Sequence, residues 1–370
     1  GEHRDPQAMA ARLGAHGVTA GVLLLPPVAV VMAVIWKDCM MAGLLAVGAA
    51  GLLSARPRAR WWGLAALVGA TAFRYNALGA TLPLIGLLFE ARPGLRPLAR
   101  YALAAVAWLA VTGAAFAINR GLTDRPMYYW QSSLALHDLV GTLARVDGEL
   151  PDAALRDALA GTGVRVDHDV HRALRAAYDP GDFLPIVGDP ATRLWDVPIN
   201  GYTPAPAAQR DAISRAWWGA ITAHPAAYAA HRLAVFAAVI DLPSTRALGV
   251  IPSRAFRYPE FAAKLGVLTT WSRLQLRLTR WMQWVGKHTP AFVPWIYLVI
   301  ALAVMPLARR QRDALALLAS GVVLEGTLLL LAHGRDFRYS HWLVISTAVG
   351  CVLVGVRRRA GRHAPAAPSA

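Results

Sequence analysis

The chain has 370 residues, of which 56% are hydrophobic and only 16% are charged. A charged fraction well below the roughly 25% of an ordinary soluble domain, combined with recurring long apolar runs, predicts a membrane protein with several spans. The net charge of +16 does not indicate a nucleic-acid surface, because the basic residues gather in short connectors between apolar runs, as in cytoplasmic loops. These connectors are 56–60, 92–100, 309–312 and 357–359.

The apolar runs predict an all-α polytopic bundle of about eight membrane segments, with both termini cytoplasmic. In the N-terminal region, 1–118, residues 1–17 are polar, and spans are expected at 18–35 (kinked at Pro26 and Pro27), 39–55 and 101–118. The chain begins with Gly1 rather than Met, so we expect further residues upstream.

The run 61–89 is apolar except for Arg74, Tyr75 and Asn76. Basic connectors flank both of its ends, so its two ends belong on the same side of the membrane. We therefore predict a hairpin of two short helices, 61–75 and 77–89, with its turn in a water-filled cavity open to the outer side.

Residues 119–290 contain most of the acidic residues and no clear span, which predicts a large, mostly helical extracytoplasmic segment. Within it, 206–232 is predicted to be helical, and the apolar piece 233–240 is too short to cross a bilayer. Residues 262–285 predict an amphipathic interfacial helix, with an apolar stripe beside an arginine stripe. Spans at 291–308, 314–332 and 342–356 then lead to a basic cytoplasmic tail, 357–370.

Three polar clusters lie at the ends of predicted spans, and the predicted topology places all of them on the outer side. They are Trp36-Lys37-Asp38, Arg74-Tyr75-Asn76 and Arg335-Asp336-Phe337-Arg338-Tyr339. Ionisable groups at a membrane edge are costly, which makes them candidates for function. Lys37 and Arg74 suit a lipid phosphate, and Asp38 suits orienting a partner or general-base chemistry.

Structural alternatives remain open for each cluster. Asp38 could cap the next helix, Arg74 could form an ion pair with Asp38 or Asp336, and residues 335–339 could be an ordinary outer loop. Glu325 lies inside a span and is expected to pair with an arginine. His137 and Asp138 in the outer segment are weaker candidates.

The sequence shows no phosphate-binding glycine loop, zinc-ligand spacing or nucleophile elbow. Cys39 and Cys351 are expected to be small buried hydrophobes. No cofactor is evident, although a divalent cation would be compatible with the phosphate-binding candidates.

Several short motifs resemble the integral-membrane C-type glycosyltransferase superfamily, near the protein mannosyltransferases and the aminoarabinose lipid A transferases. The motifs are IWKD at 35–38, FRYNA at 73–77, SLALHDLVG at 133–141, HPAAYAAHRL at 224–233 and RDFRYSHWLV at 335–344. The resemblance implies an enzyme of the cell membrane that moves a sugar from a polyprenyl-phosphate donor to an extracytoplasmic glycan, lipid or protein acceptor.

The resemblance also implies roles for individual residues. Lys37, Arg74, Arg335 and Arg338 correspond to groups that face the donor phosphate, and Asn76, Tyr339, His137 and Asp138 are supporting residues. Asp38 and Asp336 are the acidic candidates for catalysis. The related families place a catalytic acidic residue in their first outer loop, which we expect to lie upstream of Gly1.

Two other classes of function fit the same composition. A polysaccharide polymerase or O-antigen-ligase type of enzyme would use a diphosphate-linked glycan and rely on loop arginines rather than on the hairpin turn. A lipid flippase or transporter would place its charges at the bilayer midplane and show repeat symmetry.

Overall fold

The computed structural model describes residues 6–33, 36–92, 94–124, 128–146, 150–166, 169–195, 205–242, 264, 266 and 271–362. Within these ranges the regular structure is helical, and the one extended contact is an isolated bridge between Asp179 and Asp182. The all-α prediction is thus confirmed for this part of the chain. The chain forms two compact units: unit 1 comprises Gly1–Phe116, Ser244–Glu325 and Asp336–Ala370, and unit 2 comprises Ala117–Pro243 and Gly326–Arg335.

Several helices are long and apolar enough to cross a membrane, which confirms the prediction of membrane-type helices. Among the described residues they are α6 (Pro97–Leu122), α16 (Arg312–Leu331) and the segment Phe337–Arg359, which joins η3 (Phe337–Ser340) to most of α17 (His341–Arg362). A bent pair, Gly14–Leu23 and Pro26–Met32, would be a fourth if it acts as one span. Helices α5 (Ala77–Leu88) and α15 (Pro294–Ala308) are apolar but shorter. Three or four of the predicted segments therefore have the length and composition of a full span.

The first predicted span, 18–35, differs from the observed helices. α1 (Pro6–Leu23) begins among residues that were expected to form a polar tail, and α2 (Pro26–Met32) starts again after a break with a bend of 71°. Pro26 and Pro27 occupy the first positions of α2. Proline is well suited there, whereas inside a continuous helix it removes hydrogen bonds. The two prolines therefore separate two helices rather than kinking one.

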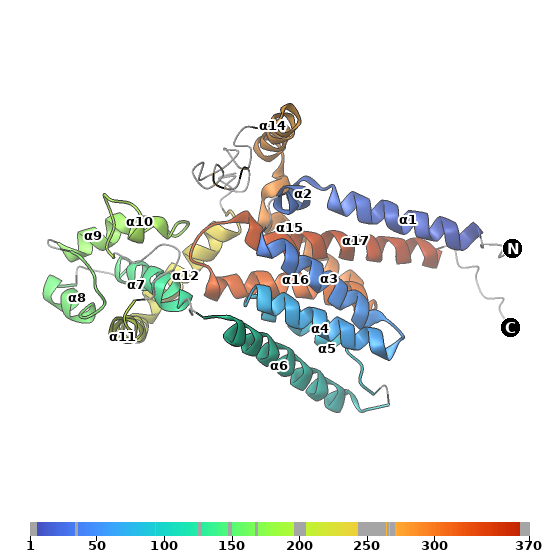
Figure 1. Ribbon diagram of the computed structural model, residues 1–370, viewed down its shortest axis with the longest axis horizontal. Coiled ribbons are helices and arrows are strands. Elements are labelled where there is room, and N and C mark those ends of the chain that lie inside the picture. The colour runs from blue at the N-terminus through green and yellow to red at the C-terminus, as the bar shows by residue number, and fades with distance from the viewer. Residues whose placement is uncertain are drawn as a thin grey trace. The chain divides into compact units, whose positions relative to one another are not determined.

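Two neighbouring helices of unit 1, α3 (Lys37–Leu53) and α4 (Pro57–Phe73), pack closely through glycines. A Cβ atom added at Gly51 would lie 2.7 Å from the Ala59 carbonyl oxygen, and one added at Gly63 would lie 2.9 Å from the Gly48 carbonyl oxygen. Small residues of this kind let the backbones of membrane helices approach. α17 lies alongside α3 in the same bundle (Figure 1).

The apolar run 61–89 is divided at Arg74, Tyr75 and Asn76, because α4 ends at Phe73 and α5 begins at Ala77. The start of α4 and the end of α5 lie together. The Arg60 guanidinium donates to the Glu90 carbonyl oxygen at 2.9 Å, and the Trp61 and Phe89 rings are 6.4 Å apart. The two helices are therefore antiparallel, with their turn at residues 74–76.

The basic connectors of unit 1 meet at one end of the bundle. The Arg312 guanidinium, at the start of α16, pairs with the Glu90 carboxylate and donates to the Leu87 carbonyl oxygen at 2.8 Å. Near the end of α17, Arg357 forms two hydrogen bonds of 2.7 and 2.6 Å to Asp313. The ends of α5 and α17 and the starts of α4 and α16 are thus linked by arginine contacts.

Unit 2 is a cluster of short helices around a buried one, α7 (Ala135–Leu143) (Figure 1). Its core includes Leu136, Leu139, Leu174 and Trp195. The other helices are η1 (Trp130–Leu134), α8 (Asp152–Ala158), α9 (Val170–Ala177), α10 (Leu184–Val187), α11 (Ala207–Ala223) and α12 (Pro225–Val239). Every residue of α7 is buried, because α9, α11 and α12 pack against it.

The predicted outer segment, 119–290, is divided between both units. Its residues up to 243 belong to unit 2, where the stretch 206–232 forms α11 and most of α12, and 233–239 completes α12. Within the predicted interfacial segment, 262–285, the structure has a helix from residue 273 onward, α14 (Arg273–His288), which belongs to unit 1. Of its predicted first part, residues 262, 263, 265 and 267–270 lie outside the described residues, as do residues 243–248.

Candidate functional site

Side chains from three distant parts of the sequence meet at one end of unit 1. We name this group the cationic cluster; it consists of Trp36, Lys37, Asp38, Arg74, Asp336, Arg338 and Tyr339. Lys37 begins α3, Arg74 follows the last residue of α4, and Asp336 precedes η3. Because α3 ends and α4 begins at the basic connectors, the cluster lies at the opposite end of these helices.

Asp38 and Arg74 form a buried ion pair at the base of the cluster. Arg74 Nη2 lies 2.6 Å from Asp38 Oδ1, and Nε donates to the same oxygen at 2.8 Å. The two side chains are only 2% and 12% exposed, and the other carboxylate oxygen, Oδ2, is buried without a hydrogen-bond partner among the described residues. This is the ion pair that the sequence left open as an alternative. The N-cap of α3 is Trp36, so Asp38 lies in the first turn and does not cap the helix.

Aromatic rings hold the two arginines of the cluster. The Arg74 guanidinium carbon lies 5.2 Å from the centre of the Tyr339 ring. The Arg338 guanidinium carbon lies 4.8 Å from the Trp36 ring and 5.5 Å from the Tyr339 ring. Cations are attracted to ring faces at such distances. These contacts tie the α3 start, the α4 end and the segment before α17 into one arrangement.

The outer part of the cluster is more accessible. Arg338 Nε lies 2.7 Å from Asp336 Oδ2, and these side chains are 30% and 27% exposed. Lys37 interacts electrostatically with Arg74, Asp38 and Arg338. The cluster thus contains three cations, Lys37, Arg74 and Arg338, against two carboxylates, which leaves an excess of positive charge.

Asp336 is the carboxylate of this cluster that is best placed to take up a proton. Burial raises the pKa of Asp336, and the opposing attraction of Arg338 does not cancel this effect. Asp336 also accepts a hydrogen bond from the Arg338 backbone N–H at 3.1 Å, which fixes its orientation. A carboxylate with a raised pKa in a cation-rich site is suited to general-base chemistry.

The structure does not bring all predicted site residues into this cluster. Asn76 is buried at the N-cap of α5, two residues after Arg74. Arg335, His137 and Asp138 belong to unit 2, where the Arg335 backbone N–H donates to the Gly181 carbonyl oxygen at 2.7 Å. The prediction for Glu325 is wrong in its partner: the Glu325 carboxylate accepts from the Ser340 hydroxyl at 2.8 Å, not from an arginine.

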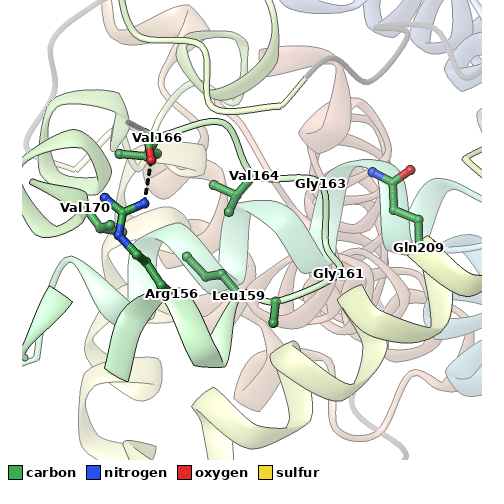
Figure 2. Close-up of a pocket in the computed structure, with 9 residues that line it drawn as sticks. Arg156, Leu159, Gly161, Gly163, Val164, Val166, Val170 and Gln209 are labelled. Carbon is green, nitrogen blue, oxygen red and sulfur yellow. Dashed lines mark hydrogen bonds between the residues drawn. The ribbon is translucent and has the colours of Figure 1, made fainter. Parts of the chain in front are cut away.

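Unit 2 contains a cavity of about 560 Å³ between α8, the start of α9 and α11 (Figure 2). Aliphatic side chains and the glycines Gly161 and Gly163 line much of it. Its polar side chains hydrogen-bond to the fold itself, because Arg156 donates to the Val166 carbonyl oxygen and Gln209 to that of Thr162. None of the predicted site residues lines this cavity, so we assign it no role in the chemistry of the cationic cluster.

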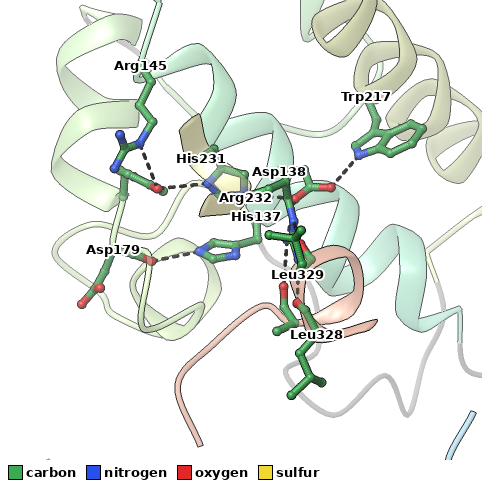
Figure 3. A network of polar contacts seen from close by, with 11 residues as sticks. His137, Asp138, Arg145, Asp179, Trp217, His231, Arg232, Leu328 and Leu329 are labelled. Atoms are coloured by element: carbon green, nitrogen blue, oxygen red, sulfur yellow. Dashed lines mark hydrogen bonds and ion pairs between the residues drawn. The ribbon is translucent and has the colours of Figure 1, made fainter. Parts of the chain in front are cut away.

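A second polar group, which we name the Asp138 network, is buried inside unit 2 (Figure 3). Asp138 Oδ1 accepts from His231 Nε2 at 3.0 Å and from Arg232 Nη1 at 3.0 Å, while Oδ2 accepts from Trp217 Nε1 at 2.9 Å. Tyr178 lies beside the other His231 nitrogen, Nδ1, at 3.0 Å. The carboxylate therefore joins α7 to α11 and α12.

Two neighbouring histidines, His231 of this network and His137 beside it, both have lowered pKa values. Burial and the neighbouring His231 lower the pKa of His137 to about 3, so its Nε2–H donates to the Asp179 carbonyl oxygen at 2.9 Å. Burial also lowers the pKa of His231 despite the adjacent carboxylate. Burial by itself would raise the pKa of Asp138, but the hydrogen bond from His231 and the charge of Arg232 lower it overall. The network thus carries one ionised carboxylate opposite one arginine.

Arg232 extends the network to the C-terminal end of α16. Its guanidinium donates to the carbonyl oxygens of Leu328, Leu329 and Ala332 at 3.3, 2.7 and 2.8 Å. The last carbonyls of a helix lack partners within the helix, so these bonds complete its end. A glycine at 141 is required beside this group, since a Cβ there would lie 1.9 Å from His231 Nδ1. The network is closed to solvent, with both His231 and Asp138 buried, which indicates a structural role.

Sequence reasoning did not identify Trp217, His231 and Arg232 as partners of Asp138. One sequence feature could have indicated these partners: His231 and Arg232 directly precede an apolar stretch, where a charged side chain is expected to need a partner. Among the described residues, no group of three or more His, Cys, Asp or Glu side chains could hold a metal ion. No protein-family model, curated protein or solved structure matches this chain.

Proposed function

We propose that the protein is a membrane glycosyltransferase that moves a sugar from a polyprenyl-phosphate donor to an acceptor on the outer side of the membrane. The observation that carries this proposal is the cationic cluster, in which Lys37, Arg74 and Arg338 converge from three distant segments with more positive than negative charge. A surplus of cations held by rings and carboxylates is suited to a phosphate group. The apolar helices that carry the cluster suit a donor whose phosphate is attached to a lipid.

The proposed topology follows from the two ends of the bundle. The end with the basic connectors is assigned to the cytoplasm, because cytoplasmic loops carry excess lysine and arginine. The cationic cluster at the other end then faces outward, together with most of residues 119–290. The short helices α4 and α5 and the bent pair α1 and α2 complete about eight membrane segments, with both termini cytoplasmic.

The chemistry assigned to the cluster is a displacement at the sugar carbon attached to the donor phosphate. An acceptor hydroxyl forms the new glycosidic bond, the bond between sugar and phosphate breaks, and the phosphate leaves with the electron pair. Lys37, Arg74 and Arg338 stabilise the negative charge on the departing phosphate. Asp336 takes the hydroxyl proton. Asp38 is a positioning residue, because its carboxylate is nearly inaccessible and pairs with Arg74.

The experiment measures release of polyprenyl phosphate by the purified, reconstituted protein from a panel of polyprenyl-phosphate pentoses and hexoses, with a cell-envelope fraction as acceptor. Arg338→Gln is expected to lower the rate about 100-fold, the effect of removing one donor to a developing charge. Arg312→Gln, at the opposite end of the bundle, serves as the matched control. Equal rates in wild type and Arg338→Gln would contradict the proposal. Activity only with diphosphate-linked glycans would instead identify a polymerase or ligase type of enzyme.

A further inference from the structure

Helix α14 presents apolar side chains that the described part of the chain leaves uncovered. Leu274, Leu278 and Trp281 are 65%, 50% and 47% exposed. Their spacing of four and three residues places them on one stripe of the helix. The helix starts with a complete capping box, in which Ser272 Oγ accepts from the Gln275 backbone N–H and the Gln275 side chain accepts from the Ser272 backbone N–H. An exposed stripe of large apolar side chains on a well-capped helix indicates a binding surface.

A basic stripe runs beside the apolar one. Arg273, Arg277 and Arg280 each precede one of these apolar residues, so the two stripes are parallel and about 100° apart on the helix. The helix ends with Lys287 and His288 and contains no acidic residue. An apolar stripe and a cationic stripe on one helix complement the acyl region and the phosphates of an anionic lipid surface.

The C-terminal end of α14 is anchored in unit 1. Val285 and Gly286 are buried, and Val285 belongs to a hydrophobic cluster with Val28, Phe292 and Phe337, against which Trp36 also packs. The C-terminal end of α14 therefore packs near Trp36, which belongs to the cationic cluster, and near Phe337, which lies between Asp336 and Arg338 of that cluster. In Figure 1, α14 is strongly foreshortened, whereas α16 and α17 of the same unit extend horizontally across the picture. A helix transverse to membrane spans is oriented to lie in the membrane surface.

We propose that α14 lies in the outward-facing surface of the membrane that the bundle spans and binds anionic phospholipid headgroups through Arg273, Arg277 and Arg280. The apolar stripe enters the boundary between headgroups and acyl chains, and the arginines pair with lipid phosphates. The membrane contact is inferred from the exposed stripes and the transverse orientation of α14, and it does not require the proposed sugar transfer. Only the side of the membrane rests on the topology proposed above.

The depth of the helix is tested with nitroxide labels on the full-length protein in phosphatidylcholine vesicles containing phosphatidylglycerol. In a background with Cys39→Ser and Cys351→Ser, the label is attached to Leu278→Cys or, as the matched control on the opposite face, to Gln283→Cys. The label at residue 278 is expected to be accessible to oxygen and shielded from an aqueous nickel complex, with the reverse at residue 283. Equal exposure of both labels to the nickel complex would overturn the proposal.

The lipid charge is tested by photocrosslinking of phosphatidylglycerol and phosphatidylcholine analogues, with the crosslinks mapped to α14. Replacing Arg273, Arg277 and Arg280 by Gln is expected to lower crosslinking of phosphatidylglycerol at least about fivefold, the contribution of a single basic residue at the surface. Crosslinking of phosphatidylcholine should remain, which shows that the helix still reaches the membrane. The matched control replaces Arg309, Arg310 and Arg312 by Gln. Unchanged phosphatidylglycerol crosslinking in the α14 variant, or equal crosslinking of both lipids in the wild type, would overturn the proposal.

Discussion

Each unit of this protein contains a buried aspartate–arginine pair, and the two pairs differ in what surrounds them. Asp138 in unit 2 uses both carboxylate oxygens, and its arginine partner completes the end of a helix. Asp38 in unit 1 pairs with Arg74 through one oxygen, while the other is buried and has no hydrogen-bond partner in the part of the chain that the structure describes. Beside the second pair lie two further cations, Lys37 and Arg338.

We interpret the Asp138–Arg232 pair as charges that stabilise the fold, and the cationic cluster as charges that can bind a ligand. A buried ion pair is tolerated when hydrogen bonds satisfy it completely, as around Asp138. The cationic cluster instead brings together three cations and two carboxylates at a partly exposed position. We expect substitutions in the Asp138 network to change stability, and those in the cationic cluster to change the proposed sugar transfer.

The largest expected effect is that of Asp336→Asn on the proposed sugar transfer. The asparagine keeps the shape of the side chain but cannot accept the acceptor proton, so the rate should fall about 100- to 10,000-fold. Donor binding, measured by competition with polyprenyl phosphate, should remain close to wild type. Loss of binding together with rate would assign Asp336 to the organisation of the cationic cluster instead.

In unit 2, Asp138→Ala removes the shared partner of His231, Arg232 and Trp217. Leaving a buried arginine unpaired costs about 3–5 kcal/mol. The loss should appear as faster hydrogen exchange of the α7 amides in the reconstituted protein. Asp157→Ala, at an exposed position of α8, is the control and should change protection by less than about 0.5 kcal/mol. Unchanged exchange of α7 in Asp138→Ala would show that the network does not stabilise the unit.

A smaller effect is expected from pH. His137 has a pKa of about 3 in the folded protein and an ordinary value of 6.5, so only the unfolded chain takes up a proton between these values. The stabilisation is therefore present above pH 6.5 and is lost as the pH falls, by about 2 kcal/mol at pH 5 for one such histidine. Hydrogen exchange of α7 at pH 7 and pH 5 measures this loss. His137→Gln, which retains a donor for the Asp179 carbonyl oxygen, should reduce the difference; an unchanged difference would assign it to other groups.

Much of unit 1 follows from local features of the sequence. The position of Arg74–Asn76 within an apolar run with two basic flanks indicates where α4 ends and α5 begins. Charge and topology group the three polar clusters on one side of the predicted membrane. In the structure Asp38 pairs with Arg74, and Arg74 and Arg338 both contact the Tyr339 ring. These features can be predicted because they depend on residues close together in the chain, or on the expectation that basic loops lie on one side of a membrane.

Other features depend on contacts that local patterns do not encode. The partners of Asp138, at positions 217, 231 and 232, are set by the packing of α7, α11 and α12. Glu325 binds Ser340 rather than an arginine because of how α16 meets η3. α1 extends back to Pro6 because the alanines in this stretch favour helix despite the polar residues between them. Helix propensity is a weaker signal in a sequence than apolar periodicity, so the sequence did not predict this extension.

The most direct test compares Arg74→Gln with the double variant Asp38→Asn/Arg74→Gln. The single variant leaves a buried carboxylate unpaired, whereas the double variant removes both charges and should restore most of the stability. If Arg74 serves the donor phosphate, the double variant should fold with near wild-type hydrogen exchange in α3 and α4 and still transfer sugar about 100-fold more slowly. Transfer by the double variant at the wild-type rate would show that Arg74 only balances Asp38, and would contradict the assignment of the cationic cluster to phosphate binding.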